Sequence, residues 1–286
     1  MSSPLSAPQE LRRDDTLLVV HAHPDDESSQ TGGTLARYAA QGKRTVLITC
    51  TDGAQGDSPT GAKPGEPGHS TQEVAAIRSA ELRSVQDILH ISDLVELRHP
   101  DSGMPDDPLS IDSRSFSRLD PAALTRQISE LLTQYQPAVV ITYPPNGLSE
   151  HPDHIRVHDT VTAAFADYRS QHHPQARLYY IAIARSRIQH LHAVVGADWT
   201  EWLPPLTIST EDSVITTAID IAGFRESKRA AIAAHTSQAD ARTLLKIFDT
   251  DAGVDQAEFY VRAEPAPDGT LETDLFATQP EVTRHD

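Results

Sequence analysis

Cysteine is almost absent from this sequence, which holds only Cys50 among 286 residues. A single cysteine cannot form an intrachain disulfide, which agrees with a reducing compartment, and we expect a cytoplasmic protein. Cys50 ends an apolar run that has the composition of a strand. We therefore expect it to be a small core residue.

Long hydrophobic runs are also missing. No apolar stretch approaches the ~18 residues that a membrane-spanning helix needs. Residues 1–13 are polar and lack the apolar core of a signal peptide, so we expect a flexible tail there. The sequence thus predicts no membrane partner.

Basic residues are few, with 24 Lys and Arg against 41 Asp and Glu, and the formal net charge is −17 at pH 7. This charge argues against unaided binding to nucleic acid or to an anionic membrane, because either would be repelled. It favours good solubility and is compatible with a homo-oligomer. No Gly-x-Gly-x-x-Gly motif follows the first apolar run, so a dinucleotide-binding protein is not expected.

Apolar runs of strand type alternate with helical patterns through the first 170 residues. This alternation predicts a layered α/β fold with a mostly parallel sheet and right-handed crossovers. Helix starts are predicted at Ser70-Thr-Gln-Glu73, which has the form of a capping box, and at Asp120-Pro121. The expected strands are Thr16–His21, Thr45–Thr49, Asp93–Leu97 and Ala138–Thr142.

The last third is less regular, and we interpret it as an irregular C-terminal elaboration of one domain spanning residues 14–265. Residues 266–286 are expected to form a loose C-terminal tail. The expected strands here are residues 178–184, 216–221 and 257–261, and the expected helices are residues 187–195 and 223–234.

Two clusters of ionisable residues follow strands one and four of this prediction. The first is His21-Ala-His-Pro-Asp-Asp-Glu27 and the second is His151-Pro-Asp-His154. Open α/β sheets bind ligands outside the carboxyl ends of their strands, where both clusters lie. His and Asp are good zinc ligands, and a catalytic zinc site needs three of them with an open position for water. We therefore predict a metal site with two ligands from the first cluster and one from the second.

A hydrolase built on such a site needs further groups. Asp25, beside the potential ligand Asp26, could accept a proton from the attacking water. The histidine of the second cluster that does not bind metal could stabilise the oxyanion and protonate the leaving amine. Asp153, between the two histidines, could orient that imidazole and raise its pKa. Either cluster alone has a plain alternative, since the first could be a capped turn and the second a solvated helix face.

These paired motifs resemble those of the PIG-L/LmbE-like zinc N-deacetylases, and most of all the mycothiol-pathway N-acetylglucosaminyl-inositol deacetylases and mycothiol S-conjugate amidases. The resemblance covers residues 16–170 well and implies a Rossmann-like three-layer fold. It implies that Zn²⁺, or Fe²⁺ in its place, is the cofactor. The roles it implies are metal ligands at His23, Asp26 and His154, a general base at Asp25, a general acid at His151 oriented by Asp153, and substrate contacts at Arg78 and Asp101.

The activity implied is removal of the acetyl group from an N-acetylated amino sugar, a small-molecule substrate of the N-acetylglucosaminide type. The alternatives are an amidase of mycothiol-type thiol conjugates, a deacetylase of a glycosylated natural product, and a catalytically idle sugar-binding module. Gln30 stands where the amidases carry lysine, which weakens the amidase alternative. Leu148-Ser-Glu150 replaces the Gly-Tyr-Gly of the deacetylases, and the added carboxylate favours a cationic or hydroxyl-rich substrate.

Several other polar residues have structural explanations. For His21 we favour a buried structural role over metal binding. His235 and Gln238 lie where a helix is expected to end, and capping and a pocket role are both open. Trp199 and Trp202 could stack on a sugar, although packing is the simpler expectation.

Overall fold

The sheet that carries both motifs has seven strands in the computed structural model, which describes residues 15–104, 108–195, 199, 202–250, 256–264 and 269–277. Their order is β3-β2-β1-β4-β5-β7-β6. The strands are β1 Thr16–His21, β2 Arg44–Thr51, β3 Asp93–His99, β4 Val139–Thr142, β5 Arg177–Ala182, β6 Thr217–Asp220 and β7 Ala257–Arg262.

Strand β1 lies at the centre and pairs in parallel with β2 on one side and with β4 on the other. All its residues are buried, as expected of a parallel strand covered on both faces. Strands β3 and β5 extend the parallel part, whereas β7 pairs antiparallel with β5 and with β6. The prediction of an α/β fold with a mostly parallel sheet is therefore confirmed.

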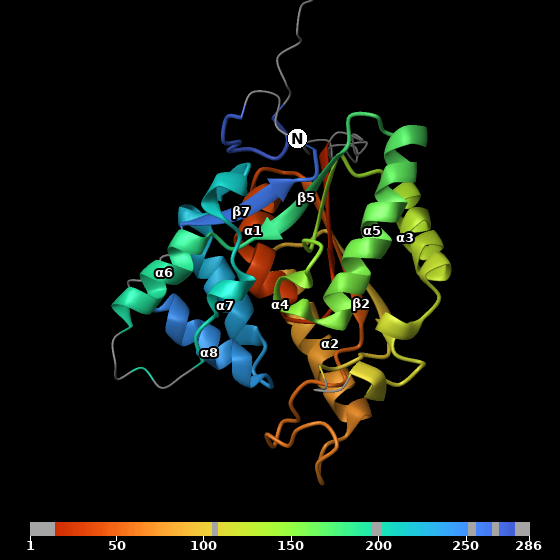
Figure 1. Ribbon diagram of the computed structural model, residues 1–286, viewed down its shortest axis with the longest axis vertical. Coiled ribbons are helices and arrows are strands. Elements are labelled where there is room, and N and C mark those ends of the chain that lie inside the picture. Colours follow the sequence, from red (N-terminus) through yellow and green to blue (C-terminus); the bar gives the residue numbers. More distant parts are fainter. Residues whose placement is uncertain are drawn as a thin grey trace, which may run out of the picture.

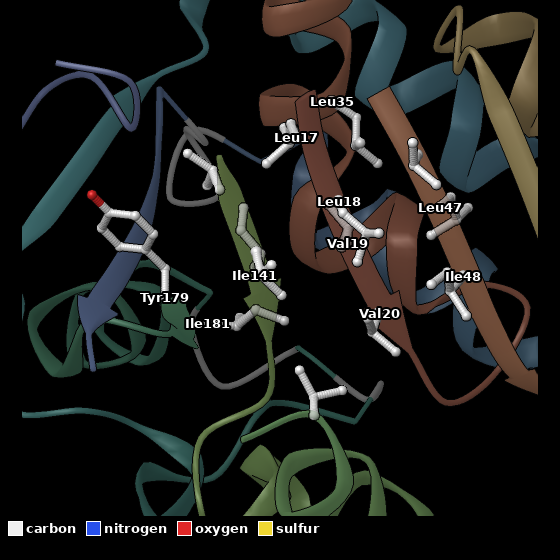
Figure 2. Packing of buried hydrophobic residues seen from close by; sticks show 14 of the residues in the cluster. Leu17, Leu18, Val19, Val20, Leu35, Leu47, Ile48, Ile141, Tyr179 and Ile181 are labelled. Atoms are coloured by element: carbon white, nitrogen blue, oxygen red, sulfur yellow. The ribbon is translucent and has the colours of Figure 1, made fainter. Parts of the chain in front are cut away.

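Helices cover both faces of the sheet and produce three layers (Figure 1). Helices α3 and α5 pack together on one side, whereas α7 packs against α1 and α2 on the other. Figure 2 shows Leu17, Val19, Leu35, Leu47 and Ile141 meeting in the core between these layers. The helices are α1 Gly32–Ala40, α2 Thr71–Ile88, α3 Pro121–Tyr135, α4 Gly147–Glu150, α5 Pro152–Gln171, α6 Arg185–Val194, α7 Arg225–Ala234 and α8 Ala239–Phe248.

Local sequence signals set several helix starts. The Ser70 side chain accepts a hydrogen bond from the backbone N–H of Glu73, and Asp120 accepts one from Ala122 with Pro121 in the first turn. Both predicted starts are confirmed. The chain coils directly after the first motif, because a π-helical turn, η2 (Glu27–Thr31), precedes α1.

The C-terminal third is more ordered than the sequence suggested. Helix α8 was not predicted, although it packs against α7. Residues 269–277 fall in the segment expected to be a loose tail, yet Leu275 is fully buried and Glu272 bridges to Thr217 of β6. The predicted tail at residues 1–13, and the parts 266–268 and 278–286 of the other, lie outside the described residues. No helix in the described part of the chain has both the length and the apolarity to cross a bilayer.

Candidate metal centre and active site

The two motifs meet because β1 and β4 are neighbours in the sheet. His23, Asp25 and Asp26 follow the carboxyl end of β1. His151 and His154 follow β4, as the N-cap and first turn of α5. Segments more than a hundred residues apart in the sequence thus contribute side chains to one place.

Three donor atoms from the two motifs face one another. His23 Nδ1 lies 3.1 Å from His154 Nε2 and 3.4 Å from Asp26 Oδ2, and His154 Nε2 lies 3.5 Å from the same oxygen. Ligands at ~2.1 Å from a tetrahedral zinc ion are roughly 3.4 Å apart. The spacing of these three atoms therefore matches that of ligands around one ion.

Each histidine of this trio is held through its other ring nitrogen. His154 Nδ1 lies 3.0 Å from the carbonyl oxygen of Gly147, and His23 Nε2 lies 3.3 Å from Asp153 Oδ2. Metal-bound histidines almost always donate their second N–H to a carbonyl or a carboxylate, which fixes the tautomer. This arrangement turns His23 Nδ1 and His154 Nε2 toward the shared point.

Gly147 must be glycine for this contact. Its φ is +61°, and a Cβ there would lie 2.8 Å from the Cβ of His154 and 3.0 Å from the backbone nitrogen of Ile155. Real Cβ atoms do not approach other atoms so closely. A side chain at this position would therefore push the carbonyl away from His154.

Tyr143 is a site residue that no sequence motif indicated. Its hydroxyl donates to Asp26 Oδ2 at 2.6 Å and accepts from the backbone N–H of Ala22 at 2.9 Å. Its ring stacks on His154, with centroids 4.2 Å apart. Tyr143 thus positions groups from both motifs. A lone aromatic residue directly after β4 was the only available signal.

Asp153 forms its side-chain contact with His23, although its charge also raises the pKa of His151 as predicted. Its buried carboxylate lies beside His23 and accepts hydrogen bonds from the backbone N–H and the hydroxyl of Ser102. The contact with His151 comes instead from the Asp153 backbone N–H, which donates to His151 Nδ1 at 3.2 Å. The reason is that His151 caps α5, so its ring turns back onto the helix N-terminus while the Asp153 side chain points inward.

The charges around His23 are strongly unbalanced. Burial disfavours a protonated His23, but the nearby carboxylates of Asp101, Asp153 and Asp26 raise its pKa well above the usual value. Burial likewise opposes the ionisation of Asp26, but His154 and His23 hold the pKa of Asp26 well below its usual range. A buried group of carboxylates that draws positive charge so strongly suits a divalent cation.

His151 is the less buried histidine of the second motif. Its ring centroid lies 4.5 Å from that of His23 and 4.9 Å from that of His154. Burial, together with the His23 and His154 rings, lowers the pKa of His151 to about 3. The ring is therefore neutral, and because Nδ1 accepts a hydrogen bond, its proton lies on Nε2.

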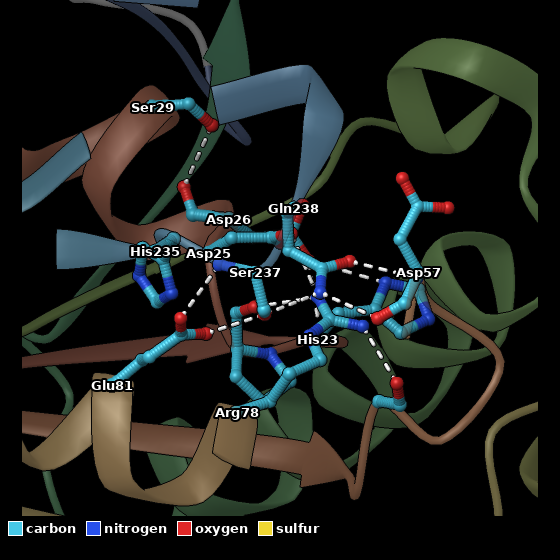
Figure 3. A network of polar contacts seen from close by, with 12 residues as sticks. His23, Asp25, Asp26, Ser29, Asp57, Arg78, Glu81, His235, Ser237 and Gln238 are labelled. Carbon is cyan, nitrogen blue, oxygen red and sulfur yellow. Dashed lines mark hydrogen bonds and ion pairs between the residues drawn. The ribbon is translucent and has the colours of Figure 1, made fainter. Parts of the chain in front are cut away.

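Asp25 is held in an unusual backbone conformation, with φ at 137°. Its backbone N–H donates to Glu27 Oε2 at 2.9 Å, and its carboxylate forms an ion pair with Arg78 at 2.7 Å (Figure 3). Burial raises the pKa of Asp25 to about 6, with Arg78 opposing the shift and Asp26 adding to it. The side chain is 32% exposed, so small molecules can reach it. Residues in strained conformations gather at functional sites.

Arg78 lies behind Asp25 rather than in open solvent. It is 4% exposed, and its guanidinium donates to the carbonyl oxygens of Pro24 and Gly53 as well as to Asp25. A Cβ on Gly53 would lie 2.6 Å from Arg78 Nη1, so the glycine allows the loop to close over the arginine. In the structure Arg78 contacts other residues of the site. The predicted contact of Arg78 with the substrate stays a prediction.

Asp101 is buried at the same edge of the sheet, with Oδ1 3.5 Å from His23 Nε2. It also accepts hydrogen bonds from the backbone N–H groups of Gly103 and Gln55. Asp101 therefore both caps a turn and lies in the site, and its predicted contact with the substrate stays a prediction. His21 is fully buried between Tyr143 and Thr31, and burial lowers its pKa to about 4, in agreement with the structural role that we favoured.

Residues of the C-terminal third support the site through polar contacts. His235, at the end of α7, pairs with the buried Glu27 at 2.8 Å. Ser237 donates to Glu81, and Gln238 donates to the Asp57 carbonyl (Figure 3). His235 therefore does more than cap its helix, because it supports the carboxylate that holds the backbone of Asp25.

Comparisons with known proteins agree with this geometry. The sequence model of the family described as PIG-L, GlcNAc-PI de-N-acetylase, matches residues 18–165. A 1D-myo-inositol 2-acetamido-2-deoxy-α-D-glucopyranoside deacetylase from Rhodococcus erythropolis is 36% identical over 78% of this chain and 80% of its own length. The deacetylase of the same name from Thermobifida fusca is 35% identical over 92% of this chain and 99% of its own length.

Solved structures share the fold at low sequence identity. N,N′-diacetylchitobiose deacetylase from Pyrococcus horikoshii has a TM-score of 0.55 at 21% identity, covering 89% of this chain and 87% of that one. GalB, a 4-carboxy-2-hydroxymuconate hydratase from Pseudomonas putida, has a TM-score of 0.57 at 18% identity, covering 88% and 97%. One fold thus carries both a deacetylase and a hydratase, so the reaction must be argued from the site.

Proposed function

Because the chain belongs to the GlcNAc-PI de-N-acetylase (PIG-L) family, we propose that it is a metal-dependent hydrolase that removes the acetyl group from an N-acetylated amino sugar. Two relatives covering most of its length are named as deacetylases of an inositol glycoside of such a sugar. The observation that carries the proposal is the trio of donor atoms from His23, Asp26 and His154, 3.1–3.5 Å apart.

These three residues would hold the metal ion. Two imidazoles and a carboxylate suit zinc, and the same donors suit ferrous iron. When bound, the ion supplies Lewis acidity, which polarises a carbonyl group and lowers the pKa of a water molecule to roughly 7. Asp153 would orient His23 through its Nε2, and Tyr143 would orient Asp26.

Two other groupings of donor atoms also lie within 4.8 Å: His23 with His151 and His154, and His23 with Asp101, His151 and Asp153. In the larger grouping, Asp153 and Asp101 both lie beside His23 Nε2, whereas His154 and Asp26 lie beside His23 Nδ1. The carboxylates of Asp153 and Asp101 therefore suit the orientation of His23 better than metal binding.

Asp25 would act as the general base. It takes one proton from the water whose oxygen attacks the amide carbon, and it then gives that proton to the amide nitrogen as the C–N bond breaks. Acetic acid and a free amine result. The ion pair with Arg78 and the Glu27 contact to its backbone N–H fix the carboxylate for both transfers.

His151 would stabilise the oxyanion. The backbone N–H of Asp153 occupies Nδ1, so the ring proton on Nε2 is available to the developing negative charge. A neutral ring with its pKa lowered to about 3 suits hydrogen-bond donation better than full proton transfer. The exposed Glu150, one residue before it, would favour a hydroxyl-rich substrate at the mouth of the site.

A metal assay combined with acetate release tests this function. Purified protein should contain about one equivalent of zinc or iron, and should release acetate from N-acetylglucosaminyl-inositol or a simpler N-acetylglucosaminide. The Asp26→Asn and His154→Ala variants should lose both metal and activity. A metal-loaded protein that cleaves no N-acetyl amide would contradict the proposed reaction, and an active protein without metal would contradict the proposed centre.

A further inference from the structure

A second cavity, of about 210 Å³, lies at the carboxyl end of β5, next to the proposed active site. Elements of the C-terminal third form most of its wall, namely α6, α7, α8 and β7. Its lining is mainly apolar and includes Ile183, Trp202, Ile208, Leu244, Ile247 and Phe259. A dry cavity of ~150 Å³ can hold a benzene ring, so this one has room for a ring or a short alkyl chain.

The residues that line the cavity are more exposed to solvent than those of the core. Core side chains of β1, such as Leu18 and Val19, are fully buried, whereas Ile183, Leu244 and Ile247 are only half-buried. At the same place Trp202 keeps 59% of its surface exposed. Apolar side chains that meet around open space gain stability when an apolar ligand covers them.

Segments that adjoin the two motifs border this cavity or pack on its wall. Ser29 and Gln30 of η2 form one side, and η2 starts directly after Asp26, whose backbone carbonyl accepts a bond from the Ser29 hydroxyl. Ile208 forms another side and belongs to the short helix η5 (Leu206–Ile208), which packs on α4 just before His151. Strand β5 is the neighbour of β4. The cavity is therefore formed against segments that adjoin both motifs.

The charged groups of the cavity have partners within the protein. Lys228 forms an ion pair with Glu258 at 2.9 Å, and Glu258 also accepts from the backbone N–H groups of Gly33 and Thr34. Arg187 donates to the carbonyl of Ala257 and lies over the ring of Phe259. Because these charged groups already have partners and most of the lining is apolar, the cavity suits an uncharged apolar group.

We propose that this cavity binds an apolar group of the amide substrate, about the size of a six-carbon chain or ring. The inference rests on the proposed function and narrows its substrate class to amino-sugar amides with a hydrophobic substituent. That group could be carried on the acyl side or on the glycosidic side of the sugar. The chemistry of the cavity is the same for both.

Two substrate series distinguish an apolar group on the acyl side from one on the glycosidic side. The first keeps the acetyl group and lengthens the glycosidic alkyl chain from methyl to hexyl. The second keeps the methyl glycoside and lengthens the acyl chain from acetyl to hexanoyl. Each buried methylene should raise kcat/KM about fourfold in the series that reaches the cavity, until the space is filled. Equal kcat/KM along both series would overturn the inference while leaving the deacetylase function standing.

Binding gives a readout that does not need turnover. The same compounds can be titrated calorimetrically into the Asp25→Asn variant, where Kd should fall along the favoured series. If no compound is hydrolysed, the proposed function fails, whereas a falling Kd still supports the cavity. A Kd that does not change with chain length contradicts the cavity whatever the activity.

Substitutions of lining residues test whether the preference for long chains arises in this cavity. Ala257 also lines the cavity, and Ala257→Leu should fill space and remove the preference for long chains. Leu244→Ser should weaken the preference by removing apolar surface. Val214→Ser is the matched control, because Val214 is apolar and 52% exposed but does not line the cavity. If folded Ala257→Leu and Leu244→Ser proteins keep the full preference, the apolar group binds elsewhere.

Discussion

Substitution of Gly147 by alanine is the sharpest test of how the proposed centre is held. An alanine at φ +61° costs roughly 1–2 kcal/mol of backbone strain. Its Cβ would also lie 2.8 Å from the Cβ of His154 and 3.0 Å from a backbone nitrogen, and relief of such overlap costs about 1–3 kcal/mol. We therefore expect the free energy of unfolding to fall by roughly 2–5 kcal/mol.

The larger effect should be on metal affinity. Moving the Gly147 carbonyl removes the 3.0 Å contact that fixes the tautomer and direction of His154. Loss of such a supporting contact typically weakens metal binding about 10–100-fold. Competition with a chromogenic chelator measures this affinity, and denaturant unfolding measures the stability.

Gly42→Ala is the matched control. Gly42 also has a positive φ, +77°, but a Cβ added there would have no other atom within 4 Å. The free energy of unfolding of Gly42→Ala should fall only by the cost of backbone strain, and its metal affinity should equal that of the parent protein. If Gly147→Ala binds metal as tightly as Gly42→Ala, the Gly147 carbonyl does not support His154 as we infer.

Four other outcomes follow from the same contacts. Asp25→Asn should keep its metal and lose about 10²-fold or more in kcat, as measured by acetate release; near-normal turnover would exclude a base at this position. Asp153→Asn should weaken metal binding roughly tenfold in chelator competition, because His23 loses its carboxylate; an unchanged affinity would remove that role. His235→Gln leaves the Glu27 charge buried without its partner, so urea unfolding should show a loss of about 3–5 kcal/mol, and a loss below ~1 kcal/mol would speak against the ion pair. Cys50 is 2% exposed and burial raises the pKa of its thiol, so a thiol reagent should label it only after unfolding; rapid labelling of native protein would contradict its place in the core.

The sheet and the meeting of the two motifs could be predicted from sequence for a simple reason. Continuous apolar runs such as Thr16–His21 are typical of buried parallel strands, and the ends of such strands lie at one edge of the sheet. The sheet order, which places β4 beside β1, then brings His23 near His154. Caps such as Ser70 are equally local, because the signal lies within four residues of the helix start.

Contacts that depend on the rotation of an element could not be predicted in this way. Asp153 was expected to contact His151, but the direction of each side chain follows from how α5 begins and how it packs on the sheet. Tyr143 gave no motif, because its role depends on atoms of Asp26 and Ala22 from another strand. The burial of Arg78 depends on the closure of the Gly53 loop, which no local pattern around Arg78 indicates.

The C-terminal third was predicted least well, since its order comes from distant partners. Strand β7 pairs antiparallel with β5 across some eighty residues, and Leu275 is buried against the sheet. No local pattern reports such partners. The site residues themselves stay predictions, and the variants above decide their roles.

The proposed catalytic residues and the cavity lining come from different regions of the chain, and this separation has an evolutionary consequence. Residues 18–165 match the family model and hold the proposed ligands and base, whereas most of the wall of the apolar cavity comes from residues 181–259. Grafting the second region from a relative would then exchange which molecules are accepted without rebuilding the chemistry. The contacts between the two regions would have to be preserved in such a chimera, among them His235 against Glu27 and Glu258 against the backbone N–H groups of Gly33 and Thr34. A lineage could diversify its substrates in this way while its reaction stayed the same.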